Sequence, residues 1–332
     1  MTSATYSAGP ARPPAVVQPA RILGWSILAV MAVFIVNNFL TFGAGLPGPV
    51  LTDFSNVTAL GLLQGLLYVA AVAGAAIYVL RSGGADLRSE GLRVAAINTF
   101  FIRAAFWAVV FVGLADTVVS FLRVEGMLES VVSEQLARDL GRSQFRGPWL
   151  HLPLIGLGFV MAIFTRTLGF HWLALLIVVA ELLIVIFRFI FSYEQAFMAD
   201  LVRFWYGAFF LFASAFTLLE DGHVRVDLVY AGLSNRAKGA VNALGSLVLG
   251  VTLCWVILIT GMGQKASIIN SPVFNFETTQ SGFGLYVKYL MAAFLAVFAI
   301  SMMIQFISTF FSSLAAWLDG EPATAAEAAK EH

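Results

Sequence analysis

The chain has 332 residues, of which 60% are hydrophobic and 11% are charged, and its 19 basic and 19 acidic side chains cancel. An average soluble domain has roughly 25% charged residues, so this composition excludes an ordinary soluble fold and indicates a protein that lies in a lipid bilayer. The balanced charge offers no basic surface to a nucleic acid, and the single cysteine, Cys254, excludes an intramolecular disulfide.

The two ends of the chain are polar. Residues 1–20 are small, polar and proline-rich, and they lack the material for a core, so we expect a disordered tail there and a second one at residues 319–332. The apolar stretch at residues 22–42 is longer than the roughly 7–15-residue core of a cleaved signal peptide. This length favours a retained signal-anchor helix.

Eight apolar stretches approach or exceed the length of about 20 residues that a spanning helix needs. They predict an all-α integral membrane protein with spans at about residues 22–42, 57–80, 99–121, 149–165, 170–191, 201–219, 239–262 and 283–316. The fourth stretch is short. If it forms a re-entrant segment, seven spans are the alternative.

Basic residues in the short loops predict the orientation of the chain. The loop at residues 43–56 has no lysine or arginine and should lie outside, whereas the loop at residues 81–98 has three arginines and should be cytoplasmic. With eight spans, this pattern places both termini in the cytoplasm. The loop at residues 122–148 conflicts with the rule, because it has four arginines yet falls outside.

Short surface helices are expected beside the spans. Apolar residues recur at helical spacing within residues 122–148, which predicts an amphipathic helix either on the membrane surface or packed against other spans. A capping box at Ser192 to Gln195 predicts the start of another helix. A further apolar stripe lies within residues 223–233, after which Ser234 can cap the next helix.

The ionisable side chains inside predicted spans include Arg103 and Asp116 in the third span and Glu181 near the middle of the fifth. Each costs about a few kcal/mol in lipid by insertion scales, so each needs a reason. A carboxylate at this depth could be a proton or cation site. We favour pairing across helix contacts that join subunits, because no second carboxylate or Asn/Ser cluster nearby forms an ion cage.

The sequence contains no pattern typical of a cofactor site, a metal site or a catalytic centre. Haem would need two histidines at similar depth on neighbouring spans, and His151 and His171 are expected at opposite faces of the membrane. There is no Walker loop and no nucleotide-binding glycine fingerprint. We therefore expect no catalytic residue, no cofactor and no ATPase activity.

Between residues 170 and 316 several motifs follow one another at regular spacing. They are Arg188-Phe-Ile-Phe191, Asp200-Leu-Val-Arg203, the segment Leu219-Glu-Asp-Gly-His-Val-Arg-Val-Asp-Leu228 with Gly222, His223, Val224, Val226 and Asp227, and Ser271-Pro272 before the last span. Asp200 and Arg203 are three apart on one helix face, which makes an ion pair easy. In these motifs and its four spans, the region resembles the small permease subunit of tripartite ATP-independent periplasmic (TRAP) transporters.

The resemblance implies a membrane scaffold without enzymatic activity, in the bacterial inner membrane. In such systems a separate large permease subunit imports a small, usually carboxylate-bearing solute with an ion gradient, and a periplasmic solute-binding protein captures the solute. Both would be partners of this chain. The minimal subunit lacks a counterpart of residues 1–169, so we expect a long form with an N-terminal membrane extension at residues 21–169 and a small-permease domain at residues 170–318.

Two other classes stay open. All eight spans could form a self-sufficient secondary carrier in which Glu181 and Asp116 carry protons, and transport by the isolated chain would favour it. The chain could also be the membrane anchor of an oxidoreductase, which would require a bound haem or quinone.

Overall fold

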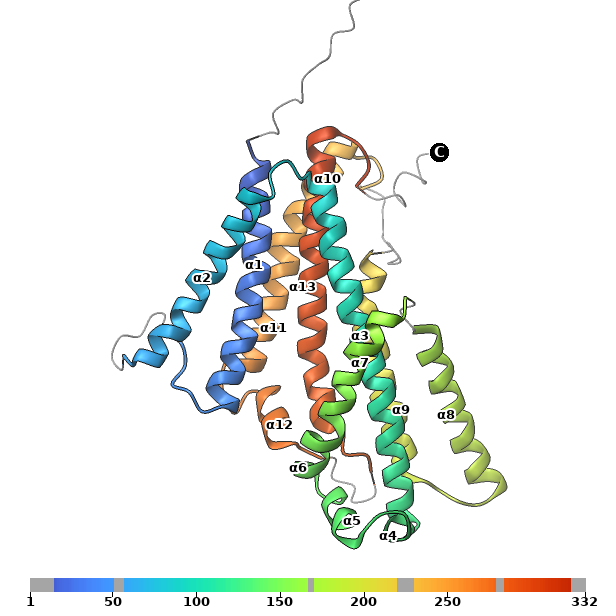
Figure 1. Cartoon of the computed structure of the whole chain (residues 1–332). Helices are drawn as coiled ribbons and strands as arrows, with labels where there is room; N and C mark the ends of the chain where they lie inside the picture. The colour runs from blue at the N-terminus through green and yellow to red at the C-terminus, as the bar shows by residue number, and fades with distance from the viewer. Residues whose placement is uncertain (1–14, 51–56, 167–169, 220–229, 279–283, 324–332) are drawn as a thin grey trace, which may run out of the picture.

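The computed structural model describes residues 15–50, 57–166, 170–219, 230–278 and 284–323. In this part of the chain all the regular elements are helices. Eight of them are long and apolar enough to cross a membrane, which confirms the predicted all-α integral membrane protein. The first helix begins and the last helix ends at the same end of the bundle, the upper end in Figure 1, as an even number of crossings requires.

The N-terminal part of the bundle consists of α1 to α7. Its long helices are α1 (Val17–Asn38), continued by a π-helical turn η1 (Phe39–Gly43), α2 (Ala59–Arg81), α3 (Leu87–Val124) and α7 (Leu152–Phe164). Because α1 begins at Val17, residues 17–20 of the expected N-terminal tail are helical, and so is Asp319 of the expected C-terminal one. Residues 1–14 and 324–332 lie outside the described residues.

Helix α3 is much longer than the predicted span at residues 99–121. It begins at Leu87, because the side chain of Asp86 accepts a hydrogen bond from the backbone N–H of Ser89 at 2.6 Å and caps the helix. Its 38 residues extend over about 57 Å, well beyond the roughly 30 Å of a hydrocarbon core. The predicted cytoplasmic loop therefore shrinks to a short turn.

The single amphipathic helix expected within residues 122–148 is not formed. Three short helices replace it: α4 (Leu128–Val131), α5 (Glu134–Leu140) and α6 (Ser143–Arg146). Gly126 has a positive φ of 67°, which a continuous helix does not allow, and the Ser133 side chain caps the start of a new helix, α5. The apolar stripe is therefore divided among separate helices. Helix α6 continues through a π-helical turn η2 (Gly147–His151) into α7, and together they form 22 continuous helical residues, Ser143–Phe164, long and apolar enough for a fourth span.

The C-terminal part comprises α8 to α13. Its elements are α8 (Phe170–Ile190), α9 (Ala196–Leu219), α10 (Asn235–Gly245), η3 (Ser246–Val251), α11 (Thr252–Met262), α12 (Asn270–Asn275) and α13 (Lys288–Asp319). The capping-box prediction is wrong, because Ser192 has a positive φ of 53° and α9 begins only at Ala196. The cap by Ser234 is confirmed: its Oγ accepts the backbone N–H of Ala237 at 3.4 Å.

Helices α3 and α13 form the centre of the bundle. Helix α13 packs against α1, α3, α9, α10 and α11, and α3 packs against α7, α9 and α13. Glycines allow two of these close approaches: a Cβ on Gly158 of α7 would lie 2.7 Å from the backbone nitrogen of Ala108, and one on Gly239 of α10 would lie 2.6 Å from that of Trp317. Each of the two hydrophobic clusters of the described residues contains side chains from both the N-terminal and the C-terminal part.

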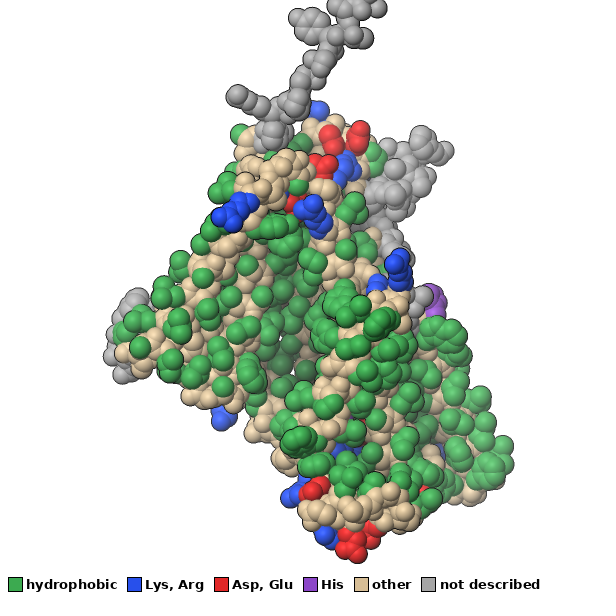
Figure 2. All heavy atoms as spheres, viewed as in Figure 1, with side chains coloured by type: hydrophobic (Ala, Val, Ile, Leu, Met, Phe, Trp, Pro, Cys, Tyr) green, Lys and Arg blue, Asp and Glu red, His purple; other side chains and the backbone are tan. Residues whose placement is uncertain are grey.

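Helices α2 and α8 lie at opposite margins of the bundle in Figure 1. Each packs mainly against one neighbour, α2 against α1 and α8 against α9. In Figure 2, hydrophobic side chains cover the flanks of the bundle, and most charged side chains gather at its two ends. This distribution fits a protein whose sides face lipid or other membrane helices.

Candidate functional site

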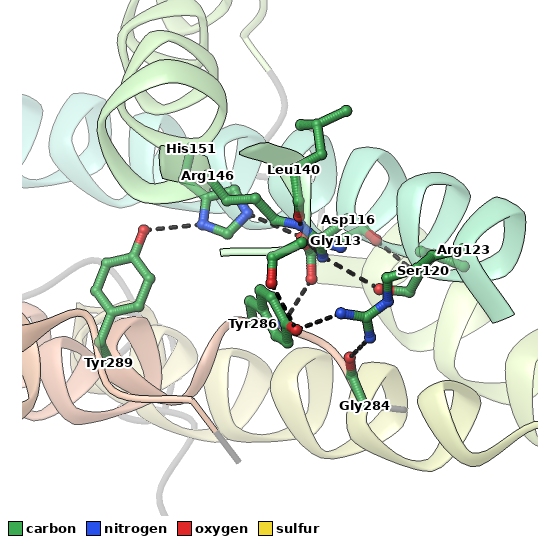
Figure 3. A network of polar contacts seen from close by, with 12 residues as sticks. Gly113, Asp116, Ser120, Arg123, Leu140, Arg146, His151, Gly284, Tyr286 and Tyr289 are labelled. Carbon is green, nitrogen blue, oxygen red and sulfur yellow. Dashed lines mark hydrogen bonds and ion pairs between the residues drawn. The ribbon is translucent and has the colours of Figure 1, made fainter. Parts of the chain in front are cut away.

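Asp116 of α3 is the centre of a buried polar cluster. Its Oδ1 accepts a hydrogen bond from Arg146 Nη1 at 2.7 Å and lies 3.1 Å from His151 Nε2. Its Oδ2 accepts the backbone N–H of Tyr286 at 2.8 Å. In Figure 3, the side chains of Arg146 and His151 converge on the carboxylate from the segment that leads into α7. Three donors therefore satisfy the carboxylate, and the side chains of the ion pair are fully buried.

Arg146 is positioned by the last turn of α6. Its Nη1 also donates to Ser120 Oγ at 3.3 Å, and its Nε donates to the carbonyl of Leu140. The guanidinium lies 4.2 Å from the centre of the Tyr286 ring, within the range of a cation–π contact. Its Nη2 has no hydrogen-bond partner among the described residues.

His151 lies in the π-helical turn η2 and links Asp116 to α13. Its Nδ1 is 2.8 Å from Tyr289 Oη, and the two rings stack with their centroids 5.9 Å apart. A carboxylate can only accept hydrogen bonds, so Nε2 of His151 carries a proton toward Asp116. In the neutral imidazole, Nδ1 then accepts the hydroxyl proton of Tyr289.

Tyr286 closes the cluster on its other side. Arg123 Nη1 donates a hydrogen bond to the Tyr286 hydroxyl, which in turn donates to the carbonyl of Gly141 at 3.1 Å. The Arg123 guanidinium lies 4.7 Å from the ring centre. The ring is thus held by two arginines from the N-terminal part, and the segment just before α13 is fixed against α3 and α6.

A second buried ion pair joins α1 to α3 at the other end of the bundle. Arg21 Nη2 lies 2.6 Å from Glu90 Oε1, and neither side chain is exposed. Trp25 Nε1 donates to the other carboxylate oxygen at 3.1 Å, and Arg21 also donates to Ser82 Oγ at 2.7 Å. This pair was not predicted from the sequence, although a cap at Asp86 implies that α3 begins early enough to bury Glu90.

Arg103 has a structural role at the end of α7. Its Nη1 donates to the carbonyl of Thr165 at 2.6 Å and to that of Ala162 at 3.2 Å. Trp107 Nε1 donates to Thr165 Oγ1 at 2.8 Å. Arg103 thus supplies donors to carbonyl groups that the last turn of a helix leaves without partners, while Trp107 holds the Thr165 hydroxyl.

The two carboxylates that the sequence singled out together differ completely in environment. Asp116 is buried and paired, whereas Glu181 is exposed on the surface of α8. Glu181 has no hydrogen-bond or ion-pair partner among the described residues. A cavity of about 150 Å³ between α3, α7, α9 and α13 is lined only by apolar side chains, among them Phe101, Phe159 and Phe204.

The motif residues of the sequence analysis lie in different places. The ion pair between Arg203 and Asp200 is confirmed, at 3.4 Å on the first turns of α9. Arg188 is exposed near the end of α8, and Ser271 and Pro272 lie in the short helix α12. The other motif residues, Gly222, His223, Val224, Val226 and Asp227, lie outside the described residues. Among the described residues, no cluster of His, Cys, Asp or Glu could hold a metal ion.

Residues 175–316 match the family model of the DctQ component of tripartite ATP-independent periplasmic transporters. This C-terminal region is therefore similar to the DctQ component. The match covers a little under half of the chain, begins in α8 and ends in α13, so α1 to α7 lie outside it. No curated protein and no solved structure matches the chain. The DctQ family is a family of transporter components, and with its eight candidate spans the chain is a multi-pass inner-membrane protein.

The Asp116 cluster connects the DctQ region to the rest of the protein. Tyr286 and Tyr289 belong to the DctQ region, whereas Asp116, Arg146 and His151 belong to α3, α6 and η2. Of these five residues, only Asp116 was predicted from the sequence to have a role in the membrane. His151 had been considered only as a haem ligand. The other residues of the cluster follow no sequence motif that would have predicted their contact with it.

Proposed function

We propose that this chain is the small scaffold subunit of a TRAP-type secondary transporter. In this role it holds a large permease subunit in the bilayer and helps to dock a periplasmic solute-binding protein. The large subunit would import a small, carboxylate-bearing solute with an ion gradient. The DctQ region supports this function, because the family supplies one component of a tripartite system.

One observation favours a scaffold over a carrier. Each buried carboxylate of the described residues has a basic partner within the chain: Glu90 pairs with Arg21, Asp116 with Arg146, and Asp200 with Arg203. A carrier needs a carboxylate that can exchange a proton or a cation along a water-accessible path. The pairs of Glu90 and Asp116 instead join α3 to α1 and to α6, and the pair of Asp200 lies within α9.

The N-terminal part has a mechanical role in this proposal. Helix α3 packs along α9 and α13, and the Asp116 cluster ties it to the segment that leads into α13. The Arg21–Glu90 pair ties α1 to α3 at the opposite end. Residues 21–169 would therefore stiffen the small-permease domain at residues 170–318 and enlarge the surface that it offers to partners.

The proposed orientation places both termini in the cytoplasm. The arginines of the loop at residues 81–98 support it, although the loop at residues 122–148 conflicts with it. The common end at which α1 begins and α13 ends supports termini on the same side. With this orientation the Asp116 cluster lies near the periplasmic ends of the spans, and the Arg21–Glu90 pair lies near the cytoplasmic ends.

Reconstitution tests the proposal. The chain is produced with and without the large permease subunit, and solute uptake by proteoliposomes is measured under a sodium gradient with the binding protein present. We expect co-purification of the large subunit, uptake by the full system and none by the isolated chain. Uptake by the isolated chain that is abolished by Glu181→Gln would overturn the scaffold and select a self-sufficient carrier. An absorbance spectrum of the same preparation tests whether the chain is instead the membrane anchor of an oxidoreductase. A Soret band would show bound haem.

A further inference from the structure

The surface of α8 has an unusual composition for a helix at the margin of a bundle. Glu181 lies near its middle and is exposed, while Leu173, Ile177 and Ala180 form the stripe that is buried against the rest of the chain. Between His171 and Arg188, Glu181 is the only ionisable residue of the helix. An unpaired carboxyl group at this depth costs free energy against hydrocarbon, so lipid is an unfavourable neighbour for this face.

Helix α2 provides the comparison within the same protein. It also packs mainly against one neighbour and exposes a long face. That face carries only apolar and aromatic side chains, among them Leu63, Leu66 and Val69, and α2 has no charged residue before Arg81. The exposed side of α2 is thus suited to lipid, whereas that of α8 is not.

A second charge lies on the same side of α8. Arg188 is seven positions after Glu181, which is about two turns or 10.5 Å along the helix, and it is also exposed. Val178 and Val185 are exposed on the turns before and after Glu181. A carboxylate in the middle and a guanidinium near the end of one apolar face form a pattern that a helix of opposite charge order can match.

We propose that this face of α8, defined by Val178, Glu181, Val185 and Arg188, docks a spanning helix of the large permease subunit. The docked helix places a lysine or arginine opposite Glu181, at the middle of the membrane. The inference rests on the proposed function, because it assigns the surface through which the scaffold holds its partner. Charge complementarity carries it: a basic side chain is the neighbour that removes the cost of an exposed carboxylate at this depth.

Site-directed crosslinking tests the location of the interface. In a Cys254→Ala background, single cysteines replace Val178 or Val185 on α8, and Val69 or Val72 on α2 serve as matched exposed valines. Each is labelled with a benzophenone maleimide in the complex with the large subunit and irradiated. We expect adducts of the mass of both subunits from the two α8 positions and none from α2.

The charge itself is tested by substitution. Glu181→Leu should weaken retention of the large subunit roughly threefold to tenfold, as expected for one interhelical polar contact in a membrane. Glu181→Lys should weaken it further through repulsion, and Val69→Leu on α2 should leave it unchanged. A monodisperse elution profile of each variant shows that the chain is folded.

The outcomes separate this inference from the proposed function. If the large subunit is retained but crosslinks only from α2, or if both Glu181 variants retain it fully, the α8 interface is wrong and the scaffold function stands. Adducts of two copies of this chain from α8, without the large subunit, also overturn the interface. If the large subunit never co-purifies with the unmodified chain, the proposed function itself fails.

Discussion

Asp116 on α3 accepts a hydrogen bond from the backbone N–H of Tyr286 at 2.8 Å, although 170 positions separate the two residues. The same carboxylate pairs with Arg146 at 2.7 Å. A residue outside the DctQ region thereby fixes the segment that leads into its last span. The N-terminal part is bound to the DctQ region by a specific polar contact as well as by apolar packing.

Removal of the Asp116 charge should destabilise the whole bundle. Asp116→Asn keeps the shape of the side chain but leaves the Arg146 guanidinium buried without a counter-charge. We expect a loss of about 3–5 kcal/mol in the free energy of unfolding, measured by denaturant titration in detergent. Glu134→Gln removes an exposed ion pair with Arg138 and should change stability by less than about 1 kcal/mol. Equal effects of the two substitutions would contradict a structural role for the cluster.

The Arg21–Glu90 pair can be tested with single and double substitutions. Arg21→Met or Glu90→Met alone leaves one charge buried and should cost about 3–5 kcal/mol in the free energy of unfolding. The double variant removes both charges and should regain most of that loss, because apolar side chains of similar size suit the site. Additive losses in the double variant would show that each residue acts through other contacts.

The contact between α3 and α7 depends on the absence of a side chain at Gly158. Gly158→Ala would place a Cβ 2.7 Å from the backbone nitrogen of Ala108, so the helices must separate. We expect a loss of about 1–3 kcal/mol, the usual range for overpacking, seen as a lower midpoint of thermal unfolding. Gly156 lies on the same helix and has nothing within 4 Å of its Cβ position, so Gly156→Ala should be neutral.

The start of α3 should depend on pH through Asp86. Hydrogen bonds from Ser89, first of all from its backbone N–H, hold the pKa of Asp86 below its usual value. A lowered folded-state pKa stabilises the helix start above the unfolded-state pKa, and the stabilisation is lost as the pH falls through the folded-state value.

Hydrogen exchange can follow this effect at the first amides of α3. Protection, corrected for intrinsic exchange, should stay constant down to about pH 5 in the unmodified chain and then fall as the pH drops below the ordinary aspartate pKa of about 3.9. Asp86→Asn retains an uncharged cap and should lack this component of the pH dependence. An identical fall in both proteins would show that another group is responsible.

Apolar length was sufficient to find the spans, because it is a local property of the sequence. The fifth span was predicted at residues 170–191 and α8 runs from Phe170 to Ile190. The predicted helix boundaries were wrong where polar or charged residues lie near the end of a helix. The start of α3 was missed because the turns that follow the Asp86 cap contain charged side chains, and the Ser192 box failed because the chain there adopts a left-handed conformation.

The sequence by itself determined the class of the protein, its eight spans and, through the motifs after residue 170, its relation to a transporter family. Only the tertiary structure decided that Asp116 is an internal anchor and that Glu181 faces outward. The physical reason is that hydrophobic length and capping act between neighbours in the chain, whereas the cost of a charge in a membrane is set by the side of the helix it lies on. That side depends on how α3 and α8 pack, and the partners of Asp116 come from positions as distant as Tyr286.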